Sequence, residues 1–235
     1  FGPTQDGTVV GDLRDDRQPY TLFRATMPSF RERPTTFTPG GDAVTIVAGS
    51  DGVLAVLEED GTTVDQGPSS PLPGDQNLIA WSYDPIAAGN KTVLVAGTAY
   101  VVRIPIRRAA TITNILLYVE VAGSGLTAGQ CFAALYQDNA LLAATADQAS
   151  AWAGSGLKTM TLASPQAVEA GFVDVLFWAQ GSTPPQMSRA NLNTSAGNAG
   201  ASTPRFATAN TGLTTTPPAT IGTRTTTAAY WAAVS

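Results

Sequence analysis

The 235-residue sequence has no histidine and a single cysteine, Cys131. Without an imidazole group, Ser-His-Asp and Cys-His triads, histidine acid–base chemistry and histidine metal sites are excluded. One thiol forms neither an internal disulfide nor a thiolate zinc site. Because the apolar residues 132–135 follow it, we expect Cys131 to be buried and inert. The sequence therefore lacks the common nucleophile–base pairs of enzymes.

Charged residues are also scarce, at 13% of the sequence, and only two of them are lysines. Residues 1–75 contain twelve carboxylates against five arginines, a net charge of −7, whereas residues 76–235 have a net charge of +2. With a pI of about 4.6 and no basic stripe, the chain is not expected to bind nucleic acid. No apolar run approaches the roughly 20 residues that span a bilayer, so membrane insertion is not expected either.

The residues that are abundant favour β-structure. The apolar stretches are short and rich in valine and isoleucine, whose β-branched side chains suit a pleated strand. Glycine (23 residues) and proline (16 residues) supply many turns between these stretches. No segment has the sustained 3.6-residue period of a long amphipathic helix. We therefore predict an all-β protein.

The first 66 residues divide into an arm and a small sheet. Residues 1–40 contain five prolines and scattered aromatics without a regular period, so we expect an extended N-terminal arm. A disordered tail is the alternative, but the aromatic side chains favour an arm that anchors the chain to a neighbouring subunit. In residues 41–66, Asp-Gly pairs at 51–52 and 60–61 separate β-branched runs, which predicts a small β-meander.

A linker is predicted at residues 67–76, where three prolines with glycine and serine favour a stiff, extended spacer. The charge balance changes at the same place, so we expect a domain boundary there. Just before it, the acidic run Glu58-Glu59-Asp60 lacks the alternating spacing of a calcium loop. We interpret this run as a solvated hairpin tip and predict no metal site.

Residues 77–235 contain short apolar segments at regular spacing, which predicts an antiparallel β-sandwich of jelly-roll type. In one segment Ile115, Leu117 and Val119 point to one side of the strand, so we expect a core-facing side there. Pro105 cannot donate a ladder hydrogen bond, which predicts a sheet edge or a bulge. The expected strands are 77–83, 91–96, 100–107, 111–121, 130–136, 140–145, 157–162, 172–180 and 225–234.

A threonine-rich segment covers residues 191–227, where twelve of 37 residues are threonine and only two are charged. A low-complexity linker is one interpretation of such a composition. Because Phe206, Leu213 and Ile221 recur along the segment, we favour a long ordered loop that these apolar residues hold in place.

Paired carboxylates, as in glycoside hydrolysis, are the catalytic device that the composition leaves open. Asp174 lies in the aromatic segment 172–178, where we expect a solvent-facing side chain instead of an acid with a raised pKa. No phosphate loop, nucleophile elbow or metal-ligand cluster is present. We therefore predict no catalytic residue and no cofactor. A polysaccharide-degrading enzyme that uses Asp174 or Glu169 is the alternative.

The aromatic residues offer a binding role. We expect Trp178 and Trp231 in the core, whereas Trp152 lies in a loop-like Ala/Ser/Gly-rich stretch and is the candidate for an exposed stacking platform. Asn191 and Asn193 lie in an almost uncharged segment, and their amides suit a hydroxyl-bearing glycan. Trp152, Asn191 and Asn193 are therefore the candidate glycan contacts. The alternative is that these loops pack between subunits.

Three stretches of the second part resemble a β-sandwich module of minor tail and tail-fibre proteins from phages that infect actinobacteria. They are Gly97-Thr98-Ala99-Tyr100 with its continuation to Ile115, Gly123-Ser124-Gly125-Leu126 with its continuation to Tyr136, and Ala146-Asp147-Gln148 with Trp152 and Gly156-Leu157-Lys158-Thr159. The stretches occur in the same order as in that module, and the resemblance covers roughly residues 77–235. It implies a virion component, often multimeric and displayed outward, and it transfers no catalytic residue.

These observations lead to a functional expectation. We expect a structural bacteriophage virion protein of the tail or fibre, with a possible host-surface contact. A capsid-surface decoration or head-fibre protein is the alternative. We expect a homo-oligomer, with a trimer favoured, in which residues 1–40 contact other virion proteins. A host cell-surface glycan is the expected external ligand, and the expected location is the exterior of the tail or capsid.

Overall fold

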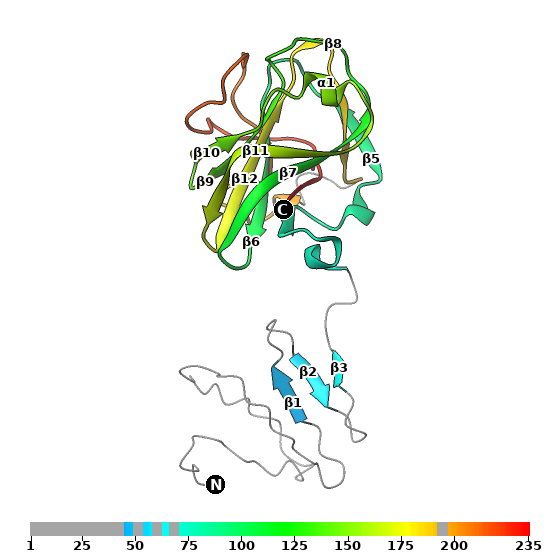
Figure 1. The fold of residues 1–235 in the computed structure, drawn as a ribbon, viewed down its shortest axis with the longest axis vertical. Helices are drawn as coiled ribbons and strands as arrows, with labels where there is room; N and C mark the ends of the chain where they lie inside the picture. The colour runs from blue at the N-terminus through cyan, green and yellow to red at the C-terminus, as the bar shows by residue number, and fades with distance from the viewer. Residues whose placement is uncertain (1–44, 49–53, 58–62, 66–70, 192–196) are drawn as a thin grey trace. The chain divides into compact units, whose positions relative to one another are not determined.

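The computed structural model describes residues 45–48, 54–57, 63–65, 71–191 and 197–235 (Figure 1). The chain divides into two units, residues 1–67 and 68–235. The described parts of both units consist of antiparallel β-sheets, so the predicted all-β class is confirmed. The predicted arm, residues 1–40, lies outside the described residues.

The described part of the first unit is a three-stranded antiparallel sheet in the order β1-β2-β3. It comprises β1 (Thr45–Ala48), β2 (Leu54–Leu57) and β3 (Thr63–Asp65). Val56, in the central strand, pairs with Ile46 on one side and Val64 on the other. The β-strands of the predicted meander are therefore confirmed, while its two turns lie outside the described residues.

The last residues of the predicted linker, residues 67–76, are not extended as expected. Instead of continuing as an extended spacer, it forms a 3₁₀ helix, η1 (Pro73–Gln76), at its last residues. The Asp75 carboxylate accepts a hydrogen bond from the Leu72 amide at 2.7 Å, and Asn77 takes a left-handed conformation with φ of 57°. These local hydrogen bonds shape the turn at the start of the second unit, to which η1 already belongs.

The second unit contains two six-stranded sheets. The first sheet has the order β10-β9-β12-β6-β15-β16, and the second has the order β4-β17-β7-β14-β5 with β11 also paired to β7. Strands β8 and β13 form a separate pair. The elements of this unit, after η1, are β4 (Ala80–Trp81), η2 (Pro85–Ala87), β5 (Asn90–Val93), β6 (Tyr100–Ile106), β7 (Ala110–Val121), β8 (Ser124–Leu126), β9 (Phe132–Gln137), β10 (Ala140–Ala144), α1 (Ala149–Trp152), β11 (Gly156–Val168), β12 (Gly171–Trp178), β13 (Gly181–Thr183), β14 (Gln186–Arg189), β15 (Phe206–Thr208), β16 (Thr225–Thr226) and β17 (Ala232–Val234).

Every apolar segment predicted as a strand in the second unit contains a strand, but two predictions need correction. The expected strand 77–83 shortens to β4, and the expected strand 225–234 is two short strands, β16 and β17, that belong to different sheets. Strands β8, β13, β14 and β15 were not predicted. They have only three or four residues and mostly polar or small side chains, so no alternation is visible in the sequence.

The main core lies between the two sheets. Val102 of β6 and Val175 of β12 face it from the first sheet, and Ile115, Leu117 and Val119 of β7 face it from the second. Each of these side chains is at most 1% exposed. The predicted core-facing side of β7 is therefore confirmed. Burial of such apolar area is the main contribution to the stability of a sandwich.

The outer face of the first sheet is covered by residues 209–222, which we call the strap; it is the orange loop beside β10 in Figure 1. The Tyr136 hydroxyl donates a hydrogen bond to the Pro218 carbonyl at 2.7 Å, and the Trp178 Nε1 donates to the Thr214 carbonyl at 3.2 Å. The strap therefore satisfies polar groups of two large aromatic side chains as it covers them. The buried side chains of this second apolar cluster are Ala99, Val101, Ala134, Tyr136, Leu176, Trp178 and Ile221.

The expectation that the threonine-rich segment is ordered is confirmed for its described part, residues 197–227, which includes the strap. Ile221 is 4% exposed and Phe206 is 3% exposed, while Leu213 packs partly buried against the same outer cluster as Ile221. The apolar residues that recur in the sequence are thus the ones that hold the loop on the sheet. Residues 192–196 lie outside the described residues.

Pro105 lies where its strand has a free edge, as predicted. On one side β6 pairs with β12 along its whole length, and on the other side β15 covers only its start, from Tyr100 to Val102. The Arg103 amide still donates to the Arg205 carbonyl at 2.8 Å. The nitrogen of Pro105 points to the same side two residues later, beyond the end of β15, so its missing N–H leaves no ladder bond broken.

Burial of the side chains of Tyr136 and Tyr230 makes the stability of the fold sensitive to alkaline pH. Burial raises the pKa of Tyr136 and Tyr230 above the ordinary value of 10.0. The folded state therefore keeps both phenols protonated while the unfolded chain ionises them, so stability is full below about pH 10 and falls as pH rises further, by up to roughly 1.4 kcal/mol per group per pH unit. Urea unfolding between pH 8 and pH 11.5 tests this expectation, and an unchanged free energy of unfolding across that range would contradict it.

Candidate functional site

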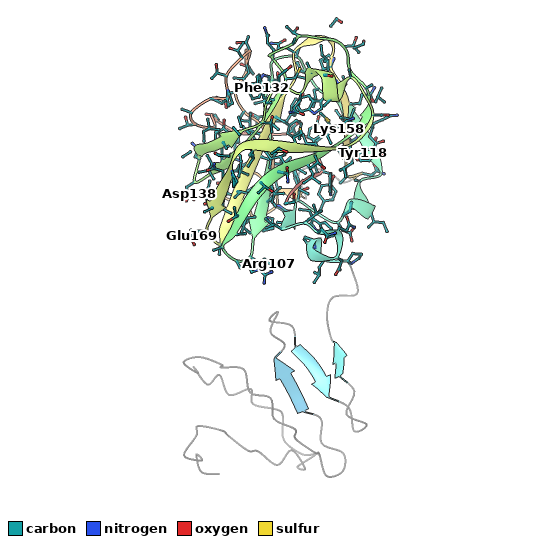
Figure 2. The ribbon with its side chains drawn as sticks, viewed as in Figure 1. Arg107, Tyr118, Phe132, Asp138, Lys158 and Glu169 are labelled. Carbon is teal, nitrogen blue, oxygen red and sulfur yellow. The ribbon has the colours of Figure 1, made fainter. Side chains whose placement is uncertain are left out.

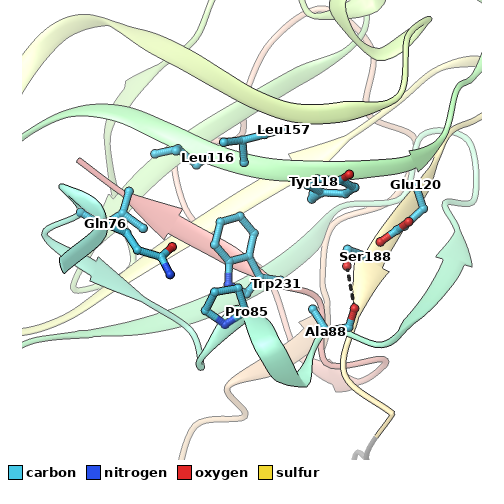
Figure 3. Close-up of a pocket in the computed structure, with 10 residues that line it drawn as sticks. Gln76, Pro85, Ala88, Leu116, Tyr118, Glu120, Leu157, Ser188 and Trp231 are labelled. Atoms are coloured by element: carbon cyan, nitrogen blue, oxygen red, sulfur yellow. Dashed lines mark hydrogen bonds between the residues drawn. The ribbon is translucent and has the colours of Figure 1, made fainter. Parts of the chain in front are cut away.

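An open hollow of about 380 Å³ lies on the outer face of the second sheet (Figure 3). This volume is within the range of small-molecule sites in proteins. Leu116, Tyr118 and Glu120 follow one another along β7, and Trp231 lies beside them just before β17. The lining residues are Gln76, Leu78, Pro85, Ala88, Leu116, Tyr118, Glu120, Leu157, Ser188 and Trp231.

The two-residue period of β7 positions one side of the hollow. Because Ile115, Leu117 and Val119 point into the core, the residues between them must point outward. Tyr118 is therefore 40% exposed, and its strand neighbour Leu157 on β11 is 53% exposed. The two side chains form an apolar surface open to solvent.

The opposite side of the hollow comes from the turn η2 and the end of the chain. The Asp84 carboxylate caps η2 by accepting a hydrogen bond from the Ile86 amide at 3.0 Å, which holds Pro85 and Ala88 in place. Trp231 is only 6% exposed and packs in a third apolar cluster with Leu116 and Ala233. Its indole thus forms part of the floor, and the predicted burial of Trp231 is confirmed, as is that of Trp178 at 0% exposure.

A second hollow, also about 380 Å³, adjoins the first and shares Ala88 and Glu120 with it. Its other lining residues are Gly89, Asn90 and Lys91, at the start of β5. We call the two hollows together the trough. One end of the trough is apolar, at Tyr118 and Trp231, and the other end is polar and contains one carboxylate and one ammonium group.

Of the predicted glycan contacts, only Asn191 lies near the trough. Its side-chain oxygen accepts a hydrogen bond from the Asn90 Nδ2 at 3.3 Å, so the amide of Asn191 supports the polar end. The expected exposure of Trp152 is wrong, because its side chain is 0% exposed and lies in the main core. The short helix α1 turns the indole inward from a segment that resembles a loop in sequence. Asn193 lies outside the described residues.

Asp174 is also placed differently from expectation. It is 3% exposed instead of solvent-facing, and its two carboxylate oxygens accept hydrogen bonds from both terminal nitrogens of Arg224, at 3.0 and 2.7 Å. A nitrogen of Arg103 lies 3.9 Å from the same carboxylate. The neighbours Val173 and Val175 point into the main core, so Asp174 faces the outer side of β12, where Arg224 covers it.

The remaining candidate groups are Glu169 and Cys131. Glu169 lies exposed in the turn between β11 and β12, where its amide and carbonyl bond to the side chain of Gln137. Figure 2 shows Glu169 at the same end of the unit as Asp138. Cys131 is 0% exposed as predicted, and burial raises the pKa of its thiol.

Within the described residues, no cluster of three or more His, Cys, Asp or Glu side chains is suited to a metal ion, and no helix is long and apolar enough to span a membrane. Comparison with protein-family models finds no family that matches the chain, and a comparison with curated proteins finds no relative. The geometry of the described residues and the sequence are therefore the basis on which a function is inferred.

The Asp174–Arg224 pair leads to a stability prediction. Asp174→Asn leaves Arg224, whose side chain is 9% exposed, without its charged partner. Breaking a buried ion pair in this way costs about 3 to 5 kcal/mol, so we expect a clearly lower midpoint in urea unfolding. The exposed Glu169→Gln serves as the matched control and is expected to change the midpoint little. Equal midpoints for the wild-type chain and Asp174→Asn would contradict a structural role for the pair.

Proposed function

We propose that the chain is a non-catalytic structural protein of a bacteriophage virion, located in the tail or a fibre. The observation that carries the proposal is the resemblance of residues 97–115, 123–136 and 146–159 to a module of phage tail and fibre proteins. These segments contain β6, the start of β7, β8, β9, α1 and the start of β11, which contribute side chains to the main core from both sheets. The resemblance thus involves residues that determine the fold.

The surroundings of the acidic residues support a non-catalytic role. A general acid needs a raised pKa and a nucleophilic carboxylate needs an open face, but Asp174 is buried against a guanidinium group with both oxygens bonded. Removing Asp174 would therefore act first on stability. The alternative function, a polysaccharide-degrading tail enzyme, would have to use Glu169 or another exposed acid in place of the doubly bonded Asp174.

A direct assay separates the two functions. We expect no increase in reducing ends when the purified chain is incubated with cell-wall polysaccharides of actinobacteria, compared with the same chain after boiling. Release of reducing ends that Glu169→Gln or Asp174→Asn abolishes would establish the enzymatic alternative and contradict the proposal.

A second prediction concerns the proposed location of the chain in the virion. In cultures that produce phage particles containing this chain, we expect the chain to co-sediment with intact particles, and antibodies against residues 68–235 to label the tail or fibre in electron micrographs. Labelling of the head would support the capsid-decoration alternative, and recovery of the chain only in the particle-free fraction would overturn the proposal.

We further propose that the protein acts as a homo-oligomer, with a trimer favoured, and that residues 1–40 anchor it to a neighbouring virion protein. Residues 1–75 have a net charge of −7, and residues 1–40 include five aromatic side chains without a periodic pattern. Such a segment gains most by burial against a partner surface. The jelly-roll arrangement of the sandwich belongs to the same proposal, because it is common among capsid and lectin domains.

A further inference from the structure

We propose that the trough on the outer face of the second sheet is a binding site for an uncharged oligosaccharide. The site is distinct from the one that the sequence predicted at Trp152, whose ring is buried in the core. The inference names the class of ligand for the proposed host-surface contact, and it therefore rests on the proposed function.

The apolar end of the trough offers a surface for a sugar ring. Tyr118 and Leu157 are direct neighbours across β7 and β11, and they are 40% and 53% exposed. Leu116 and Trp231 lie next to them and close the floor. A pyranose ring has a C–H face that packs on an aromatic or aliphatic surface, and its hydroxyl groups stay at the edge. Tyr118, which is apolar in its body and polar at its tip, suits both parts of such a ring.

The polar end offers the Glu120 carboxylate and the Lys91 ammonium group. Among the residues drawn in Figure 3, only Ser188 and Ala88 are joined by a hydrogen bond, so the Glu120 carboxylate at the polar end has no partner within this set. At the adjoining hollow, Asn90 is held by Asn191 and lies next to Lys91. Carboxylate, amide and ammonium groups together bind hydroxyls, which both donate and accept.

The charges of the trough favour an uncharged ligand. Glu120 and Lys91 are the only lining residues that are charged at neutral pH, so their formal charges cancel. Glu120 would repel an anionic polymer and Lys91 would repel a cationic one, so the trough favours neither sign of charge. The two adjoining hollows, one apolar and one polar, suit a short chain of sugar rings better than a single ring.

The sheet geometry disfavours a peptide as the occupant. An extended peptide binds a sheet by pairing with a free strand edge. The floor strands β7 and β17 are paired on both sides, β7 by β17, β14 and β11, and β17 by β4 and β7. Where β7 and β17 form the floor, the trough therefore presents side chains and no free backbone ladder, and the edge strand β5 borders its polar end alone.

The test titrates the purified full chain with maltotriose, cellotriose, mannotriose and triacetylchitotriose, by calorimetry and by NMR of the ¹⁵N-labelled chain. We expect at least one trisaccharide to bind saturably and to shift the amide signals of Tyr118, Glu120 and Asn90. Tyr118→Ala is expected to weaken that affinity by about five- to tenfold, because it removes the stacking surface. Tyr118→Phe is expected to retain most of it.

Phe172→Ala is the matched control, because Phe172 is 45% exposed on β12, in the other sheet, and this change is expected to leave the affinity unaltered. Binding that shifts signals elsewhere, or no binding by any of the four sugars, would overturn the inference. So would a Tyr118→Ala chain that loses its oligomeric state in light scattering, because the trough would then be a subunit contact. Particle fractionation tests the virion role separately, so the two proposals fail independently.

Discussion

Strand β17 occupies an interior position in the second sheet, between β4 and β7, although it is formed by the last residues of the sequence. Ala233 pairs with Trp81 on one side and with Leu116 on the other. The Ser235 carbonyl accepts hydrogen bonds from the amides of Thr113 and Asn114, at 2.7 and 2.9 Å. A sheet with an interior strand missing would leave backbone groups on both neighbours without partners, so the second sheet depends on this strand.

The two outer faces of the sandwich differ in how far the chain covers them. On the first sheet, the strap and Arg224 cover the aromatic cluster and neutralise Asp174. On the second sheet, Trp231, just before β17, forms a floor, but no comparable segment among the described residues covers Tyr118 and Leu157. One face is therefore closed by the chain itself, and the other keeps an apolar surface beside unpaired polar groups, which is the usual character of a ligand site.

Sequence alone predicts the parts of this fold that depend on local pattern. The alternation of Ile115, Leu117 and Val119 is a property of one strand, and so is the effect of Pro105. The buried pair of Asp174 and Arg224 joins residues fifty positions apart, and no period in either segment signals it. Arg224, one of only two charged residues in a threonine-rich segment, is the signal that could have suggested it. The predicted exposure of Trp152 was wrong for a related reason, because α1 is too short to show a helical period in the sequence.

Native-state hydrogen exchange of the amides in β17 tests most directly whether this strand closes the sandwich. If β17 is an interior strand, the amides of Ala232, Ala233 and Val234 exchange only through global unfolding, at rates similar to those of the hydrogen-bonded amides in β12. Exchange of these amides orders of magnitude faster than in β12, at the rate typical of a fraying chain end, would show that the sheet is stable without β17 and would contradict the account.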